Sequence, residues 1–152
     1  MRSAGLLMFR RAGNGLELLL AHPGGPFWAR KDDGAWSLPK GEMLDSEDAL
    51  AAACREFEEE TGCPPTGPFL DLGEVRMKSG KRVQAWAFEG DLDPAQLRCN
   101  LFEMEWPPRS GRMQQFPEVD RVAWFDPATA RRKLLPVQAP LVDRLEDLLL
   151  AA

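Results

Sequence analysis

Apolar and polar positions along the chain predict short strands mixed with helices. Short apolar or alternating runs, bounded by glycine, proline or charged residues, are typical of strands. Such runs occur at Ala4–Phe9, Leu16–Ala21, Phe69–Val75, Val83–Phe88, Asn100–Trp106 and Arg121–Phe125. The first two flank Arg11–Gly15, a glycine-rich segment that predicts a hairpin turn. The Pro/Gly-rich segment from His22 to Ala35 predicts a loop, and Trp36–Leu38 a short extended piece.

Other segments show helical spacing instead. Ser46–Thr61 is the strongest of them, with Gly62 as a C-terminal stop and a Pro-Pro pair beyond it. Asp126–Leu134 has proline in its first turn. In Leu141–Leu150 the leucines repeat at helical intervals and indicate an amphipathic helix, which we expect to pack on its own sheet. Strands mixed with helices indicate an α+β fold, with one mixed sheet covered on both faces.

Length and composition place the chain among ordinary globular proteins. Its 152 residues are enough for one domain, spanning residues 1–152. No apolar run approaches the ~20 residues of a membrane span, and the start is too quickly charged for a signal peptide. The odd number of cysteines, without a CxxC pair, favours a cytoplasmic location. With His22 as the only histidine, a structural zinc site lacks ligands. Oligomeric state stays open.

The negative charge of the chain is concentrated in one segment. Between Glu42 and Glu60 there are eight acids and one base, a balance of −7, whereas the other residues hold 16 acids and 18 bases, a balance of +2. Binding to duplex nucleic acid is disfavoured, because it requires a basic surface. A metal-loaded site is favoured, because closely packed carboxylates are costly unless cations neutralise them.

Helical geometry sorts the side chains of this segment, since each residue turns by ~100°. The face expected to pack on the sheet holds Leu50, Cys54, Phe57 and Thr61. A neighbouring face holds Glu56, Glu59 and Glu60, and the small residues on that side are Ala49 and Ala52. Glu58 points elsewhere. Oxygen-only ligands suit Mg²⁺ or Mn²⁺; the alternative is a solvated acidic helix face.

The residues around these glutamates follow one pattern. It reads glycine, five residues, glutamate, seven residues, Arg-Glu, an apolar residue, any residue, Glu-Glu, any residue, glycine and an apolar residue. The segment from Gly41 to Cys63 matches every fixed position. This is the Nudix box, and the chain resembles Nudix hydrolases over the box and in the strand order around it. The resemblance implies an α/β/α sandwich with a mixed β-sheet between helices. It is nearest to short bacterial-type predicted NTP pyrophosphohydrolases.

The resemblance also implies a metal-dependent phosphoanhydride hydrolase and assigns roles within the box. Its catalytic metal ligands are Glu56, Glu59 and Glu60. Arg55 braces a catalytic glutamate, Glu47 is a supporting carboxylate, and Gly41 and Gly62 permit the loop–helix–loop backbone. Lys40, directly before the box, is placed to contact a phosphate as a point charge, with an ordinary loop lysine as the alternative. The general base is a box glutamate or one of Glu103, Glu105 and Glu118.

Substrate choice lies outside the box. In the loop upstream of it, a nucleobase could stack on Trp28 or Phe27 while Arg30 or Lys31 meets a phosphate. A hydrophobic loop anchor is the alternative. The segment Glu105–Phe116 predicts a long flexible loop, suited to covering phosphate or serving only as a connection.

The sequence is compatible with several functions. The leading one is hydrolysis of an NTP or a related nucleoside diphosphate derivative. The alternatives are a dinucleoside polyphosphate hydrolase, a non-catalytic nucleotide-sensing Nudix domain and, least favoured, RNA decapping. The chain has no tyrosine, so the downstream tyrosine typical of diadenosine polyphosphate hydrolases is missing. We therefore expect a small nucleotide as the partner, and neither duplex nucleic acid nor a membrane.

Overall fold

The structure is a computed structural model that describes residues 2–13 and 15–151. A mixed sheet forms its centre. Within these residues the main sheet has six strands; the order is β4-β5-β1-β2-β8, and β3 pairs with β1. Their bounds are β1 Arg2–Ala12, β2 Gly15–Pro23, β3 Lys40–Glu42, β4 Leu70–Arg76, β5 Arg82–Glu89 and β8 Val119–Phe125. Strands β1 and β5 run parallel and their neighbours pair antiparallel. The predicted mixed sheet is therefore confirmed.

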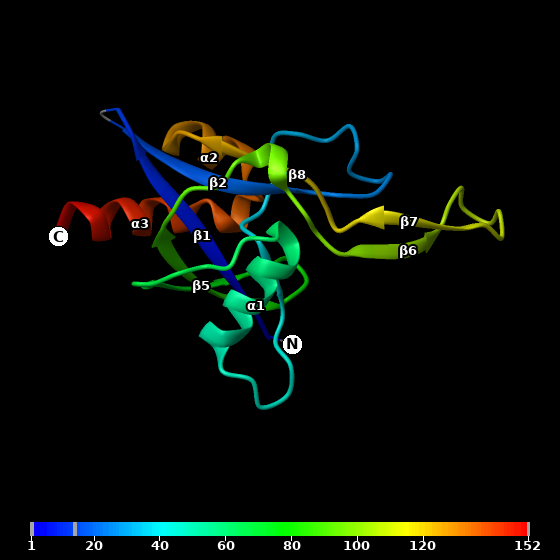
Figure 1. Cartoon of the computed structure of the whole chain (residues 1–152), viewed down its shortest axis with the longest axis horizontal. Helices are drawn as coiled ribbons and strands as arrows, with labels where there is room; N and C mark the ends of the chain where they lie inside the picture. The colour runs from blue at the N-terminus through cyan, green and yellow to red at the C-terminus, as the bar shows by residue number, and fades with distance from the viewer. Residues whose placement is uncertain (1, 14, 152) are drawn as a thin grey trace.

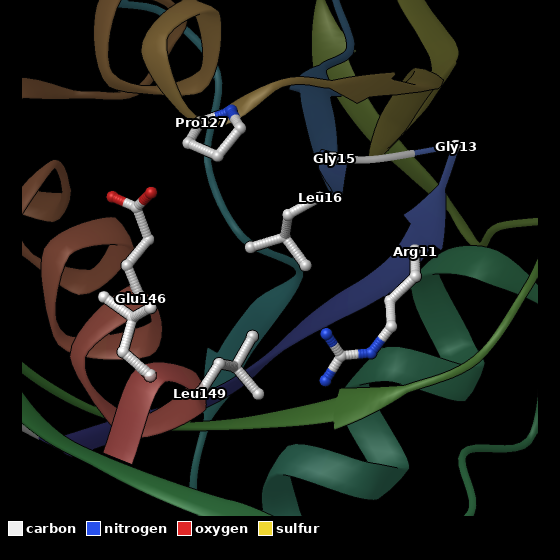
Figure 2. A pocket seen from close by; sticks show the side chains of 8 residues that line it. Arg11, Gly13, Gly15, Leu16, Pro127, Glu146 and Leu149 are labelled. Carbon is white, nitrogen blue, oxygen red and sulfur yellow. The ribbon is translucent and has the colours of Figure 1, made fainter. Parts of the chain in front are cut away.

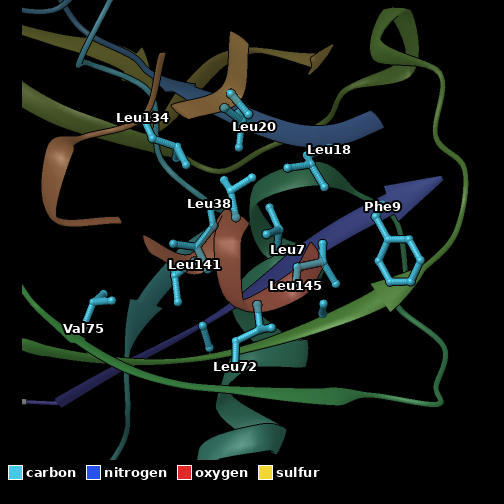
Figure 3. Close-up of a cluster of buried hydrophobic side chains, with 14 of the residues drawn as sticks. Leu7, Phe9, Leu18, Leu20, Leu38, Leu72, Val75, Leu134, Leu141 and Leu145 are labelled. Atoms are coloured by element: carbon cyan, nitrogen blue, oxygen red, sulfur yellow. The ribbon is translucent and has the colours of Figure 1, made fainter. Parts of the chain in front are cut away.

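Helices cover both faces of this sheet. Successive side chains of β1 point to opposite faces, so the strand contributes to an apolar cluster on each face. Leu6 and Met8 join the cluster of helix α1 (Ala49–Thr61), which inserts Phe57. Leu7 joins the opposite cluster, where helices α2 (Pro127–Lys133) and α3 (Pro140–Ala151) pack. Figure 3 shows Leu7 in this second cluster beside Leu145 of α3. The expectation that the last helix packs on its own sheet is confirmed.

A second, two-stranded sheet stands apart from the first. Strands β6 (Leu101–Glu105) and β7 (Met113–Pro117) pair antiparallel and project from the body on the side away from the C-terminus (Figure 1). The segment that follows β2 lies along this hairpin: Phe27 and Trp106 meet edge to face, with ring centroids 5.5 Å apart. Short 3-10 turns occupy Pro94–Gln96 and Pro136–Gln138.

The structure corrects several predicted boundaries. Helix α1 begins at Ala49 and not at Ser46, because the Asp48 carboxylate accepts a hydrogen bond from the Ala51 N–H (3.1 Å) and caps the helix. Strand β7 occupies the second half of the predicted loop Glu105–Phe116. Its residues 113–115 are all exposed, so no apolar alternation indicates a strand there. Strand β3 is too short for a periodic pattern.

Of two expectations about side chains of α1, one is wrong and one is confirmed. Ala52 was expected beside the carboxylates, but it is fully buried in the α1 cluster, because the buried face of the helix extends to Ala52 and Ala53. Glu58 is exposed, as expected.

Of the helices in residues 2–13 and 15–151, none is long and apolar enough to cross a membrane.

Candidate active site

Helix α1 is fixed at both ends, and this sets the direction of its glutamates. Gly62 ends the helix in a left-handed conformation (φ 79°), which glycine adopts without a Cβ penalty, and its N–H donates to the Glu58 carbonyl at 2.7 Å. On the sheet side Phe57 is fully buried and meets Phe88 edge to face, with centroids 5.2 Å apart. With the rotation of the helix fixed, the Glu56 and Glu60 side chains are directed toward β3.

Arg55 connects the loop before α1 to the glutamates on the helix. Its Nε and Nη2 donate to the two carboxylate oxygens of Glu47 at 2.9 and 3.0 Å, a bidentate pair. Its Nη1 donates to Glu56 Oε1 at 2.9 Å and reaches both oxygens of Glu59 at 3.4 Å. Nη2 also donates to the Glu42 carbonyl at 3.1 Å. One guanidinium therefore orients three carboxylates.

This pairing perturbs the ionisation of both partners. Hydrogen bonds from Arg55, and then from the Leu44 N–H, lower the pKa of Glu47 from its ordinary 4.5 to about 2. The hydrogen bonds to Glu47 and Glu56 raise the pKa of Arg55 above its ordinary value. Glu47 therefore stays ionised at all pH values near neutrality and holds the guanidinium in place.

Gly41 leaves room for the Glu56 carboxylate. A Cβ at residue 41 would overlap the carboxyl group of Glu56. The backbone of Gly41 pairs with Ala4 of β1, so the strand has no freedom to withdraw. Glycine is therefore required at position 41 because the Glu56 carboxylate approaches its Cα closely. At position 62 glycine is required because the backbone is left-handed.

Glu60 and Lys40 meet at a small cavity beside the helix. The backbone N–H of Lys40 donates to Glu60 Oε2 at 3.2 Å. The cavity has a volume of about 180 Å³. Its walls are formed by Ala21, Pro23, Ser37, Leu38, Lys40, Glu60, Glu118 and Val119. The site thus combines one cationic and two acidic side chains with several apolar ones.

Burial dominates the electrostatics of this cavity. Desolvation raises the pKa of Glu60 to about 8, against the favourable charge of Lys40. Desolvation also lowers the pKa of Lys40 and raises that of Glu56. The pKa of Glu118 is raised by desolvation and then by the charge of Glu59. These carboxylates lie close enough to repel one another, which favours a cation among them.

The structure separates the three candidates for an acid outside the box. Glu118 lies between β7 and β8 and lines the cavity with Glu60. Glu103 and Glu105 lie on the exposed side of β6, in the projecting hairpin. The sequence alone ranks none of the three, because the junction of β7 with β8 is not visible in its pattern.

The three substrate-contact candidates have different positions. Lys40 lines the cavity. Trp28 lies half-buried in the turn after β2, with Lys31 Nζ 5.0 Å from the centre of its ring, and Arg30 is exposed on the same turn. Neither Trp28 nor Arg30 lines this cavity. Ser37 and Pro23, which do, carry no signal that sequence reasoning could have used.

The donor set of α1 suits a hard divalent cation. Glu56, Glu59 and Glu60 supply oxygen ligands only, the chemistry that Mg²⁺ and Mn²⁺ prefer, with water completing the coordination. In the described part of the chain, however, no three acidic, cysteine or histidine side chains converge on one point. Arg55 holds Glu56 and Glu59, and the Lys40 N–H holds Glu60. The residues fit the ion chemically, while their side chains are paired within the protein.

A larger cavity lies elsewhere, between the tip of the β1–β2 hairpin and α3 (Figure 2). Its volume is about 480 Å³, and its walls are Arg11, Gly13, Gly15, Leu16, Pro127, Glu146, Leu149 and Leu150. No residue of the box lines it. Size alone therefore does not identify the active site.

Comparison with known families agrees with this geometry. The family model described as the NUDIX domain matches residues 1–145. With its carboxylate-bearing helix on a mixed sheet, the protein is an enzyme of the pyrophosphohydrolase class. The chain belongs to the Nudix family. A comparison with curated protein sequences gives no match.

Solved structures share the fold at low sequence identity. A C. elegans Ap4A hydrolase in a binary complex aligns with a TM-score of 0.70 and 20% identity, covering 99% of this chain and 98% of the other. The NUDIX domain of Shewanella oneidensis NrtR, complexed with ADP ribose, aligns with a TM-score of 0.65 and 18% identity over 98% and 88%. A mutT/nudix family protein from Listeria innocua gives 0.64 and 16% over 99% and 94%. These similarities confirm the predicted fold class.

Proposed function

We propose that this enzyme uses Mg²⁺ or Mn²⁺ to hydrolyse a phosphoanhydride bond in a nucleoside diphosphate linked to another moiety, such as an NTP. One observation carries the proposal. Arg55 orients the carboxylates of Glu56 and Glu59, and Glu60 of the same helix lines a cavity with Lys40 and Glu118. This arrangement combines ligands for a cation with a positive charge for phosphate.

Each residue then has a defined task. Glu56, Glu59 and Glu60 would hold the cation, which when bound polarises phosphate oxygens and makes water a better nucleophile. Lys40 would neutralise charge on a phosphate oxygen. Glu118, which lines the cavity together with Glu60, would accept the proton of the attacking water. Arg55 and Glu47 keep the ligands oriented.

The size of the cavity suggests how the substrate lies. Pockets that enclose a drug-sized ligand measure ~300–1,000 Å³, so about 180 Å³ suits a diphosphate group but not a whole nucleotide. The nucleoside would extend over the rim. Pro23, which lines the cavity, leads directly into the turn that carries Trp28 and Arg30, which supports the predicted substrate contacts of these two residues.

A nucleotide panel tests the proposal. NTPs, ADP-ribose and diadenosine tetraphosphate are incubated with Mg²⁺ or Mn²⁺, and phosphate, pyrophosphate and nucleotide products are separated. We expect metal-dependent turnover of at least one compound, with a ~10²-fold or greater loss in Glu59→Gln and Glu60→Gln. Glu58→Gln is the matched control, since Glu58 is exposed on the same helix, and should keep full activity.

Product analysis distinguishes the alternatives. In ¹⁸O-labelled water, the labelled product identifies the phosphorus attacked and separates NTP pyrophosphohydrolysis from dinucleoside polyphosphate cleavage. Tight nucleotide binding without turnover of any compound would instead indicate a sensing domain. Turnover that is equal in Glu59→Gln, Glu60→Gln and Glu58→Gln would refute the proposed site.

A further inference from the structure

The only histidine of the chain is fully buried and hydrogen-bonded at both ring nitrogens. His22 Nδ1 lies 2.9 Å from Asp120 Oδ1, and Nε2 lies 2.6 Å from the Lys31 carbonyl oxygen. Its ring also meets the Trp36 ring edge to face, with centroids 5.0 Å apart. No box residue makes either hydrogen bond, so this histidine has a task of its own.

Both hydrogen-bond partners of the ring are acceptors. A carboxylate and a backbone carbonyl offer no proton, and neutral imidazole carries only one N–H. In either neutral tautomer, one ring nitrogen would therefore direct a lone pair at an oxygen of Asp120 or Lys31. Only the imidazolium, with two N–H groups, satisfies both contacts, and the Asp120 carboxylate compensates its charge.

The two contacts of His22 join separate parts of the fold. The ring belongs to β2 and Asp120 to β8, while Lys31 belongs to the segment 24–35 that follows β2. This segment lies along the β6–β7 hairpin (Figure 1). A Cβ at Gly24 would overlap the Pro117 carbonyl oxygen, so the segment and hairpin are in close contact. The same segment carries Trp28 and Arg30.

Charged residues lie on the elements around the histidine. Asp120 of β8 favours the protonated ring, whereas Arg121 of the same strand, 3.6 Å from Asp120 and 5.1 Å from the centre of the Trp36 ring, opposes it. On the segment, Asp32 accepts from the Trp36 indole N–H at 2.8 Å. Asp32 is itself paired with Lys133 of α2 at 2.6 Å. Among residues 2–13 and 15–151, Asp120 is the one carboxylate bonded directly to the ring.

We propose that His22, as an imidazolium, is a positioning residue that holds segment 24–35 against the hairpin and thereby places the substrate-side turn beside the active site. The ring needs both protons for this task. The consequence for substrate binding rests on the proposed function, but the state of the ring and of the segment does not.

Two measurements on the free protein test the proposal without a substrate. Because the chain has a single histidine, a ¹⁵N-¹H spectrum of its ring reports this residue alone. We expect both ring nitrogens to be protonated at pH 7 in the wild type. In Asp120→Asn, which removes the charge that compensates the imidazolium, amides of residues 24–35 should exchange about ten-fold faster than in the wild type at pH 7. This conservative variant preserves an acceptor for Nδ1 and should fold.

Asp33→Asn is the matched control. Asp33 lies on the same segment and pairs with Lys133 at 3.1 Å and Arg132 at 3.4 Å, without a hydrogen bond to His22. It should leave the protonation of the ring unchanged. A neutral ring at pH 7 in the wild type, or exchange of residues 24–35 that is equal in Asp120→Asn and wild type, would overturn the proposal.

Kinetics supply a further readout once the panel has provided a substrate. KM should be higher in Asp120→Asn than in the wild type, while kcat follows the same pH profile in both proteins. A KM that is unchanged in Asp120→Asn would contradict the positioning role. Failure to find any substrate would refute the proposed function and leave the NMR and exchange results to decide the state of His22.

Discussion

The carboxylate of Glu56 occupies the space that a side chain at residue 41 would need. The resemblance to Nudix hydrolases implied a backbone role for Gly41, but its φ is not in the left-handed region. What the position requires is the absence of a Cβ. Gly41 and Glu56 belong to one motif but lie 15 positions apart in sequence. The pairing of β3 with β1 holds Gly41 beside the Glu56 carboxylate.

Gly41→Ala should therefore impair activity more than folding. The added methyl group displaces the Glu56 carboxylate, and a displacement of about 1 Å can cost ~10²-fold in rate. We expect a loss of this order in kcat for the substrate found in the panel. Gly15→Ala is the control, because its Cβ would meet only the Ala12 carbonyl oxygen at an ordinary 3.8 Å. Equal activity of the two variants would contradict this account of Gly41.

Glu47 makes the stability of the site depend on pH. Its pKa is lowered from 4.5 to about 2 by Arg55 and the Leu44 N–H. The stabilisation from a lowered carboxylate pKa is complete above the unfolded-state value and is lost as the pH falls through the folded-state value. The difference in Tm between wild type and Glu47→Gln should therefore be largest above pH 5 and shrink toward pH 2. A difference that is constant over this range would show that Glu47 contributes no ion pair.

At the scale of elements, α1 holds the site because its apolar face is anchored in the sheet. Phe57 is fully buried and contacts Phe88 of β5. The glutamates emerge from a neighbouring face of the same two turns. Catalytic geometry and packing are thus coupled through a single helix of 13 residues.

Phe57→Ala should destabilise the protein by ~3–5 kcal/mol, the usual cost of removing a buried phenyl ring. Chemical denaturation with tryptophan fluorescence would measure it. Phe27→Ala removes the same side chain at a position that is 61% exposed and should cost less than about 1 kcal/mol. Similar losses in both variants would mean that α1 is not anchored through Phe57.

At the scale of the whole molecule, charge is segregated. The segment Glu42–Glu60 has a balance of −7 in a chain of net charge −5. Arg55 compensates part of this charge, and the pKa values of Glu56 and Glu60 are raised. A bound divalent cation would relieve the remaining repulsion and stabilise the folded state by mass action.

Mn²⁺ or Mg²⁺ should therefore raise the Tm, and EDTA should reverse the effect. At a concentration 100 times Kd, the expected stabilisation is ~2.7 kcal/mol. Glu59→Gln and Glu60→Gln should lose most of this gain, whereas Glu58→Gln should keep it, which differential scanning calorimetry would show. An equal gain in all three variants would place the cation elsewhere.

Local pattern was sufficient to predict the mixed sheet, the helices on both its faces and the acidic face of α1. These features depend on periodicity and spacing, which neighbouring residues set among themselves. The exposed position of Glu58 followed from the same geometry. The strand β7 was not predictable, because its exposed side chains do not alternate. The single domain of residues 1–152 and the cytoplasmic location stay predictions.

The sequence by itself determined the class of chemistry, because the box places its glutamates within two turns of one helix. Only the tertiary structure decided what surrounds them. Strand pairing brings Lys40 to Glu60, the junction of β7 with β8 brings Glu118 to the same cavity, and Asp120 meets His22 across 98 positions. Such contacts depend on how strands pair over long separations, and no local spacing records that pairing.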